Sequence, residues 1–102
     1  MAADPKVIEL IYSSIDEHNE IADPSKTLAK SLDTVLFGMN GNLDSLELVS
    51  LIIAVEDRIQ REFETDISIA DDRALSQTRS PFSTVGKLAE WTSELVKEAT
   101  DV

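Results

Sequence analysis

The feature that most restricts the fold of this chain is a regular apolar pattern in its middle third. Large apolar residues recur at spacings of four, three, four and four, at Leu48, Ile52, Val55, Ile59 and Phe63. This period places them on one face of an α-helix, which Val49 and Leu51 widen. If each of the five contributes about 1.5–3 kcal/mol on burial, packing outweighs the ~1 kcal/mol of a good helix cap. The pattern predicts a helix from about Ser45 to Phe63, stabilised mainly by a core.

Two further amphipathic segments flank this helix. The first begins at Asp4, with Pro5 at the position where a missing backbone N–H costs nothing, and should end near Asn19. The last takes Ser83 or Thr84 as its N-cap. The residues that these helices are expected to bury are Val7, Ile8, Ile11 and Ile15 in the first, and Val85, Leu88, Trp91 or Thr92, Leu95 and Val96 in the last.

Long connections join the three helices. In the first connection, Asp23 and Pro24 predict a short helical turn that carries Leu28 and Leu32. Connections longer than about 12–15 residues are usually functional or pinned to the core, and the apolar residues available as the pin are Val35, Leu36 and Phe37. The second connection is expected to contain a short third helix around Asp71 to Leu75. The expected fold is therefore all-α: one domain over residues 1–102, a small bundle with three main helices, a short third helix and a long first loop.

Composition narrows the classes of function. A length of 102 residues with 42% hydrophobic content suits one small domain. The formal net charge of −11 repels nucleic-acid phosphates and anionic lipid, and attracts basic surfaces. The absence of cysteine excludes disulfides and thiolate metal ligands, and no apolar run is long enough to span a bilayer. We expect a monomeric, soluble, cytoplasmic protein that binds no nucleic acid and does not insert into membranes.

The sequence GNLDSL, residues 41–46, places a serine where a polar loop becomes the central helix. One interpretation is structural: Asp44 caps the helix, Glu47 completes a capping box, and Ser45 is merely tolerated in the first turn. The other is functional, because a first-turn serine projects its hydroxyl beside free backbone N–H groups at the positive end of the helix dipole. A phosphodiester would be stabilised there. The local pattern alone favours the structural interpretation.

Considered with the whole chain, Asp44-Ser45-Leu46 resembles the attachment motif of acyl carrier proteins. The resemblance extends over nearly the whole chain: a first amphipathic helix, a long loop, the Asp-Ser-Leu helix, a short third helix, and a last helix opened by the sequence STV where the family commonly has a Thr-Val pair. The tripeptide by itself is common by chance. Its combination with this size, acidity and helix order is specific, and it favours the functional interpretation of Ser45.

The resemblance implies a carrier and not an enzyme, with no catalytic residue and no metal site. Ser45 would bear a 4′-phosphopantetheine arm that a phosphopantetheinyl transferase takes from coenzyme A. The thiol of that arm would hold acyl or related carboxylic intermediates as thioesters. The other partners would be an acyl-loading ligase or synthase and acyltransferases with basic surfaces, in fatty-acid, lipid or specialised acyl metabolism.

The resemblance also places partner recognition on the exposed side of the central helix. Acids that lie off the apolar stripe would meet basic patches on processing enzymes, as the corresponding acids of the family do, although the charges by themselves are equally consistent with a solvated face. Ile53 could add an apolar contact or fold partly into the core. The residues expected to recognise partners are Asp44, Leu46, Glu47, Ile53, Glu56 and Asp57.

The motif departs from the fatty-acid carrier pattern Leu-Gly-Ala-Asp-Ser-Leu. Gly41 lies one place earlier than the family's glycine, and Leu43 directly precedes Asp44. Leu-Asp-Ser is similar to free-standing carriers of specialised pathways, including D-alanyl carrier proteins. Ser50 stands where many carriers have a recognition glutamate. Two alternatives therefore stay open: an aminoacyl carrier with the same arm, and an acidic helical interaction module whose Ser45 is never modified.

Two singular side chains favour structural roles. His18, the one histidine of the chain, is expected at the surface near the end of the first helix, beside its dipole. Trp91 is expected to anchor the last helix in the core. The acidic residues lack the spacing of a calcium loop, so no dedicated metal site is predicted.

Overall fold

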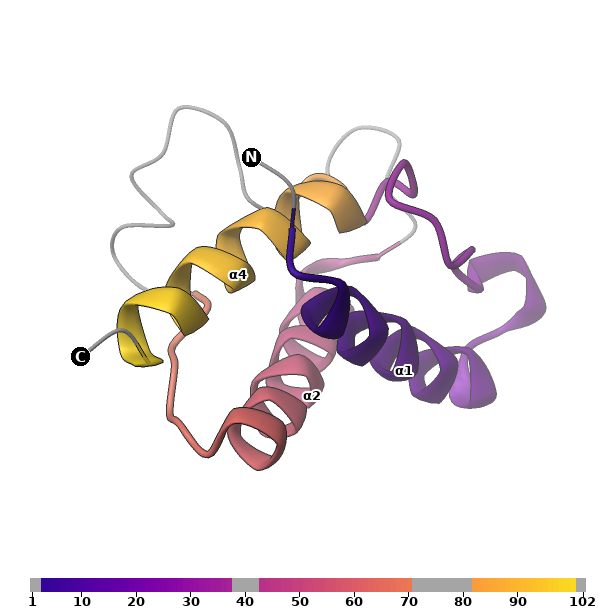
Figure 1. Cartoon of the computed structure of the whole chain (residues 1–102). Coiled ribbons are helices and arrows are strands. Elements are labelled where there is room, and N and C mark those ends of the chain that lie inside the picture. The colour runs from indigo at the N-terminus through magenta and orange to yellow at the C-terminus, as the bar shows by residue number, and fades with distance from the viewer. Residues whose placement is uncertain (1–2, 38–42, 71–81, 101–102) are drawn as a thin grey trace.

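The central helix forms over the residues that the apolar period predicts. The computed structural model describes residues 3–37, 43–70 and 82–100. In order along the chain it contains α1 (Pro5–Ile21), the 3-10 helix η1 (Pro24–Lys26), α2 (Ser45–Phe63) and α4 (Val85–Thr100), as Figure 1 shows. Each of the three α-helices packs against the other two around one core. The described residues form an isolated bridge but no strand, so the fold is a small helical bundle.

The buried face of α2 confirms most of the predicted stripe. Phe63 is half-buried against the core, and the fully enclosed positions are Leu48, Leu51, Ile52, Val55 and Ile59. The prediction that Val49 widens this stripe is wrong, because its side chain is 49% exposed. At about 100° per residue, Val49 and Leu51 lie equally far from the centre of the predicted stripe but on opposite sides, and the core covers only the side of Leu51. The helix ends where Glu64 takes the left-handed conformation, at φ 52° and ψ 42°.

The first helix begins as predicted and runs two residues further. Asp4 caps α1, and its side chain accepts a hydrogen bond from the amide of Lys6 at 2.9 Å. The last turn continues past Asn19 because the amide of Ala22 still bonds the carbonyl of His18 at 3.0 Å. Of the predicted stripe, Ile8 is half-buried, and the fully buried residues are Val7, Ile11 and Ile15.

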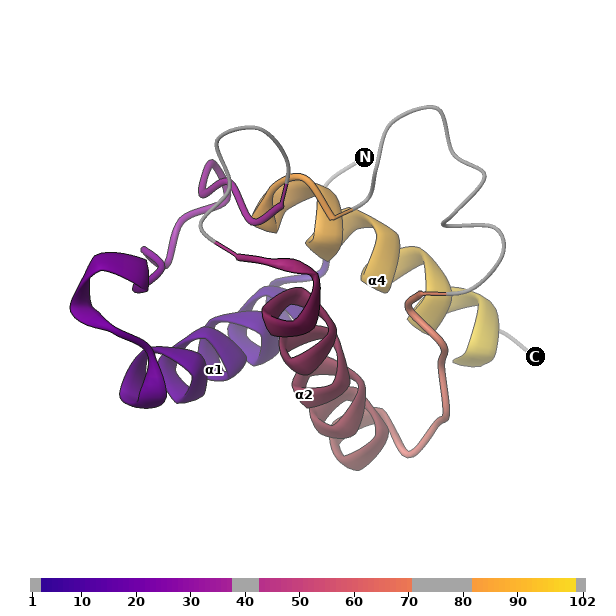
Figure 2. The same cartoon turned by 180° about the vertical axis from the view of Figure 1, so that it is seen from behind.

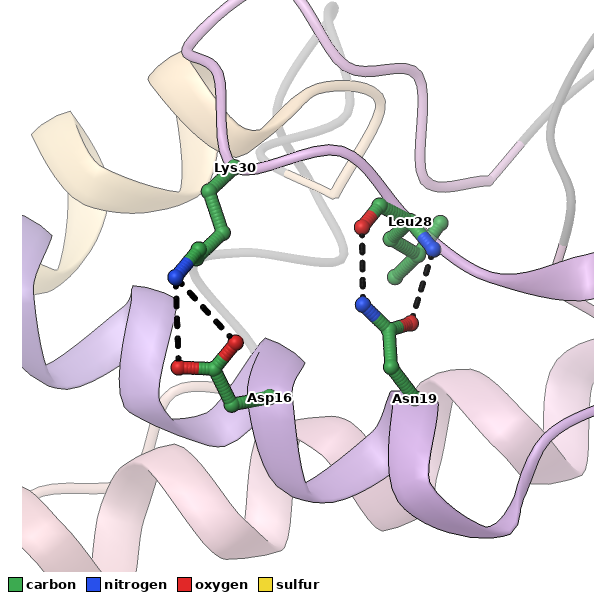
Figure 3. A network of polar contacts seen from close by, with 4 residues as sticks. All are labelled: Asp16, Asn19, Leu28 and Lys30. Atoms are coloured by element: carbon green, nitrogen blue, oxygen red, sulfur yellow. Dashed lines mark hydrogen bonds and ion pairs between the residues drawn. The ribbon is translucent and has the colours of Figure 1, made fainter.

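A single side chain of α1 holds the start of the first connection (Figure 3). The amide of Leu28 donates to Asn19 Oδ1 at 2.8 Å, and Asn19 Nδ2 donates to the carbonyl of Leu28 at 2.9 Å. Lys30 and Asp16 form an exposed ion pair beside this contact, at 3.3 Å. Because both backbone groups of Leu28 are satisfied, its side chain can be buried without leaving an unpaired polar group.

The apolar residues expected to pin this connection divide between core and surface. Leu36 is fully buried, whereas Val35 and Phe37 are each 37% exposed. Successive side chains of an extended backbone point to opposite sides, so burial of Leu36 turns both neighbours outward. Leu28 lies in the core, but Leu32 is exposed. The predicted turn exists as η1, yet it ends at Lys26, before both leucines that it was expected to carry.

The same connection completes the first turn of α4. The amide of Val85 donates to the carbonyl of Thr34 at 3.0 Å, and the amide of Gly86 donates to that of Leu32 at 2.8 Å. A Cβ atom on Gly86 would lie 3.0 Å from the Leu32 carbonyl oxygen, so the close approach favours glycine. Of the two predicted caps, Thr84 acts as one, since its Oγ1 accepts from the amide of Lys87 at 3.1 Å.

The second connection is fixed at Ile69, which is fully buried. Its amide donates to Glu56 Oε2 of α2, and its carbonyl accepts from Trp91 Nε1 of α4, each at 2.7 Å. Residues 64–70 accordingly run from the end of α2 to α4 in both views (Figures 1 and 2). The short helix predicted at Asp71 to Leu75 falls outside the described residues. Trp91 is confirmed as a core anchor.

The buried face of α4 confirms the predicted set and extends it. Both members of the Trp91 or Thr92 alternative are buried, because the face is wide enough to include adjacent positions. Within the described part of the chain, Thr92 Oγ1 has no hydrogen-bond partner. The buried residues of α4 are Val85, Leu88, Ala89, Trp91, Thr92, Leu95 and Val96.

Candidate functional site

The candidate site lies at the N-terminal end of α2, where Ser45 is the first helical residue. The capping box predicted for this end is present: the amide of Glu47 donates to Asp44 Oδ1 at 2.8 Å, and the amide of Asp44 donates to Glu47 Oε1 at 3.1 Å. The amide of Leu48 begins the regular helical bonds, to the carbonyl of Asp44 at 2.9 Å. Helix geometry gives the amides of Ser45 and Leu46 no acceptor within the helix.

This end of α2 is anchored to the core by the residue that precedes the cap. Leu43 is buried, and its amide donates to the carbonyl of Leu36 at 3.2 Å. Leu36 is itself fully buried and bonded through its amide to the carbonyl of Ser83, at 2.8 Å. A firmly held backbone therefore leads directly into Ser45, while Leu46, one residue later, is 76% exposed. At this site the backbone is fixed by the core, and the adjacent face of α2 is exposed to solvent.

A row of exposed apolar side chains continues from this end along α2. Leu46, Val49 and Ile53 follow one another at spacings of three and four residues, so they share one face of the helix. Ile53 is 58% exposed, which resolves its position in favour of the surface. We call these three residues the apolar stripe. Monomeric proteins expose single apolar residues commonly, but a contiguous row is typical of an interaction surface.

The acids expected to recognise partners already have partners within the chain. Asp44 and Glu47 bond each other's backbone amides in the capping box. Glu56 accepts the amide of Ile69, and Asp57 Oδ2 pairs with Arg61 at 3.2 Å. The structure thus places the six predicted residues on α2 and its N-cap, with Glu56 turned toward the second connection and Leu46 and Ile53 exposed.

The residues present at this end fit a covalently attached phosphodiester. The two uncapped amides and the helix dipole provide partial positive charge next to the hydroxyl-bearing residue. The cap carboxylate of Asp44 is held by the amide of Glu47, and so is committed to a donor. Ser45, the first helical residue, is the hydroxyl-bearing residue that directly follows the cap. A phosphopantetheine group could be held there by the Ser45 oxygen and the amides of the first turn.

The remaining sequence features are the single histidine, possible metal ligands and possible membrane-spanning helices. His18 lies in the last turn of α1, as predicted. Within residues 3–37, 43–70 and 82–100, no cluster of three or more His, Cys, Asp or Glu residues could hold a metal ion. No helix in those ranges is long and apolar enough to cross a bilayer.

Sequence reasoning missed part of the apolar stripe because it assigned Val49 to the core. The signal was present: Leu46, Val49 and Ile53 keep a helical spacing of their own, on a face of the helix beside the core stripe. The sequence marks Leu43 only as a departure from the family pattern, and nothing in its neighbours indicates that it anchors the site. Comparison with models of protein families, with curated proteins and with solved structures finds no match for this chain.

Proposed function

We propose that this protein is a carrier, modified at Ser45 by 4′-phosphopantetheine and delivering acyl or related carboxylic intermediates to partner enzymes. The observation that carries the proposal is the start of α2, where a core-anchored, capped helix begins at a serine and continues into an exposed apolar stripe. The helix order and the Asp-Ser-Leu sequence add the resemblance to acyl carrier proteins. The wider setting would be fatty-acid, lipid or specialised acyl metabolism in the cytoplasm.

The residues of the chain divide this task between attachment and recognition. The Ser45 oxygen would form the bond to phosphorus, its proton being taken up by the transferase as the nucleotide part of coenzyme A leaves. The amides of Ser45 and Leu46 would then face the phosphodiester and restrain the base of the arm. When bound, the group would supply a thiol, which holds cargo as a thioester. The chain has no cysteine to compete for that cargo.

Modification is tested by incubating the purified chain with coenzyme A, Mg²⁺ and a broad-specificity phosphopantetheinyl transferase, and then measuring its intact mass. We expect a gain of one phosphopantetheine, and no gain with Ser45→Ala. Ser50→Ala is the matched control, because Ser50 is an exposed serine on the same helix. A gain that survives Ser45→Ala, or no gain with a transferase active on a reference carrier, contradicts the proposal.

The apolar stripe is proposed to dock partners, including the transferase. Ile53→Ser should lower the kcat/KM of the transferase for this chain about tenfold, since burial of one such side chain is worth about 1.5–3 kcal/mol. Ile21→Ser is the control, because Ile21 is 87% exposed but lies at the end of α1. Equal effects of the two substitutions would show that the stripe is not the docking surface.

Acids around the stripe are proposed to speed the encounter with basic partner surfaces. Charges of this kind raise association rates more than they tighten binding. The rate of transferase association should therefore fall steeply as NaCl is raised from low concentration to above physiological strength. A rate that stays constant over that range contradicts the role proposed for Asp44, Glu47 and Asp57.

The capping box supports a second candidate function, an acidic helical interaction module whose Ser45 stays unmodified. Asp44 and Glu47 bond each other's backbone amides at the start of α2, and these bonds do not require a modification of Ser45. The mass measurement separates the two functions. An aminoacyl carrier, such as a D-alanyl carrier, would show the same mass gain, and trapping the thioester formed with a neighbouring ligase would distinguish its cargo.

A further inference from the structure

A groove lies at the opposite end of α2 from Ser45. It is enclosed by the start of α1, by Phe63 in the last turn of α2 and by the outer side of α4, and its volume is about 830 Å³. A helix of 19 residues separates it from Ser45, a distance of about 28 Å. The groove is therefore a separate feature from the attachment site and from the apolar stripe.

The walls of the groove are apolar and firmly held. Ala3, Pro5 and Phe63 line it together with Val96 of α4. The amide of Asp4 donates to Ser93 Oγ at 2.9 Å, which ties the start of α1 to α4 across the groove. Because the walls are fixed by this bond and by the core beneath them, the groove exists before any partner arrives. Binding to it would require little ordering of this chain.

The rim of the groove carries excess negative charge. Three carboxylates, those of Asp4, Glu90 and Glu94, line it with one ammonium group, that of Lys97. Glu90 and Glu94 are exposed, and within the described residues neither has an ion-pair partner. The C-terminal end of the α4 dipole, which is negative, adds to this field. The groove thus joins an apolar floor to carboxylates that outnumber the one cation, Lys97, among its described lining residues.

We propose that this groove binds a short basic segment of a partner protein, with one apolar side chain on the floor and arginine or lysine side chains on Glu90 and Glu94. The volume lies within the range of about 300–1,000 Å³ typical of sites that enclose a ligand group. A second copy of this chain does not suit the groove, since each copy carries a net charge of −11. The inference does not depend on modification of Ser45.

The test uses the full-length chain and a fluorescein-labelled ten-residue peptide with four arginines around a central Phe-Leu pair. Fluorescence anisotropy at low salt gives its Kd. Glu90→Gln with Glu94→Gln should raise the Kd about fivefold, because two exposed ion pairs are lost. The matched control is Glu9→Gln with Glu20→Gln, two exposed acids of α1 that remove the same net charge. The control should change the Kd less than about twofold. Equal effects of the two double substitutions would overturn the proposal, because only the total charge would then matter.

Two further measurements locate the peptide. Amide chemical-shift changes should gather at residues 3, 4, 63 and 90–97, and the Ser45→Ala chain should give the same pattern. Shift changes confined to Leu46, Val49 and Ile53 would overturn the groove as the site and assign basic segments to the apolar stripe. A peptide with Ser-Ser in place of Phe-Leu should bind about tenfold more weakly. Unchanged affinity would overturn the apolar anchor.

Discussion

Two buried residues of the connections, Leu28 and Ile69, are held by the same device, but they depend on different parts of the molecule. In each, the side chain enters the core while side chains from helices satisfy the backbone amide and carbonyl. Asn19 of α1 satisfies both groups of Leu28. Ile69 is bonded by Glu56 of α2 and by Trp91 of α4. The first contact holds a loop to one helix, whereas the second joins two helices through a loop.

This difference predicts how much of the structure loosens when each contact is removed. Loss of the Asn19 contact should release the first connection and leave the packing of α1, α2 and α4 in place. Loss of the Ile69 contact should loosen α2 from α4, because these helices share the backbone of Ile69 as a common hydrogen-bond partner. Six substitutions at five positions test this comparison.

The largest effect is expected from truncating the two buried side chains. Ile69→Ala and Leu28→Ala should each lower the free energy of unfolding by about 2–5 kcal/mol, with Ile69→Ala at the upper end because it leaves a cavity between helices. Urea denaturation followed by circular dichroism measures both. A larger loss for Leu28→Ala would reverse the comparison.

Trp91→Phe removes one bond of the Ile69 contact and keeps an aromatic ring in the core. The expected loss of unfolding free energy is about 2–3 kcal/mol, because a buried carbonyl is left without its donor and some volume is lost. Circular dichroism in urea is the appropriate measurement, since the fluorescent indole is absent from the variant. A loss below about 0.5 kcal/mol would show that the Ile69 carbonyl finds another donor.

Asn19→Ala should cost about 1–2 kcal/mol, less than the Trp91 substitution, because the Leu28 backbone is only partly buried and water can replace the amide. The decisive measurement is hydrogen exchange, in which protection should fall at the amide of Leu28 and persist in the centre of α2. Glu20→Ala, on the exposed side of the same helix, is the control. Loss of protection throughout α2 would contradict a merely local role.

The smallest effect is expected for Glu56→Gln, within about 0.5 kcal/mol of the parent chain. The amide oxygen still accepts from Ile69, and the loss of one negative charge from a protein of net charge −11 relieves repulsion. Glu56→Ala, which removes the acceptor, should cost about 1–2 kcal/mol. Similar melting temperatures for the two variants would show that the bond to Ile69 does not contribute.

The sequence predicted those parts of the fold that depend on neighbours along the chain. The bounds of α2, the caps at Asp4 and Asp44, and the capping box with Glu47 are all confirmed, since periodicity and capping act over a few residues. The contacts of Leu28 and Ile69 had no such signal. An asparagine in a helix does not indicate which distant backbone its side chain will bond, and an isoleucine in a loop does not indicate which helices it will join.

In the candidate site, too, local features could be predicted from the sequence and tertiary contacts could not. Ser45 at the start of a helix could be read from GNLDSL, whereas its anchoring through Leu43 depends on where Leu36 is buried. Exposure of Val35 and Phe37 was not predictable from their apolar character, because the direction of each side chain depends on the neighbour that the core selects.

The first turn of α4 is completed by carbonyl groups of Leu32 and Thr34, which lie far upstream in the chain. In most helices the first amides exchange with solvent early, because their ends fray. Here the amides of Val85 and Gly86 should exchange only when the upstream loop detaches. Their exchange rates would therefore report how often the first connection opens.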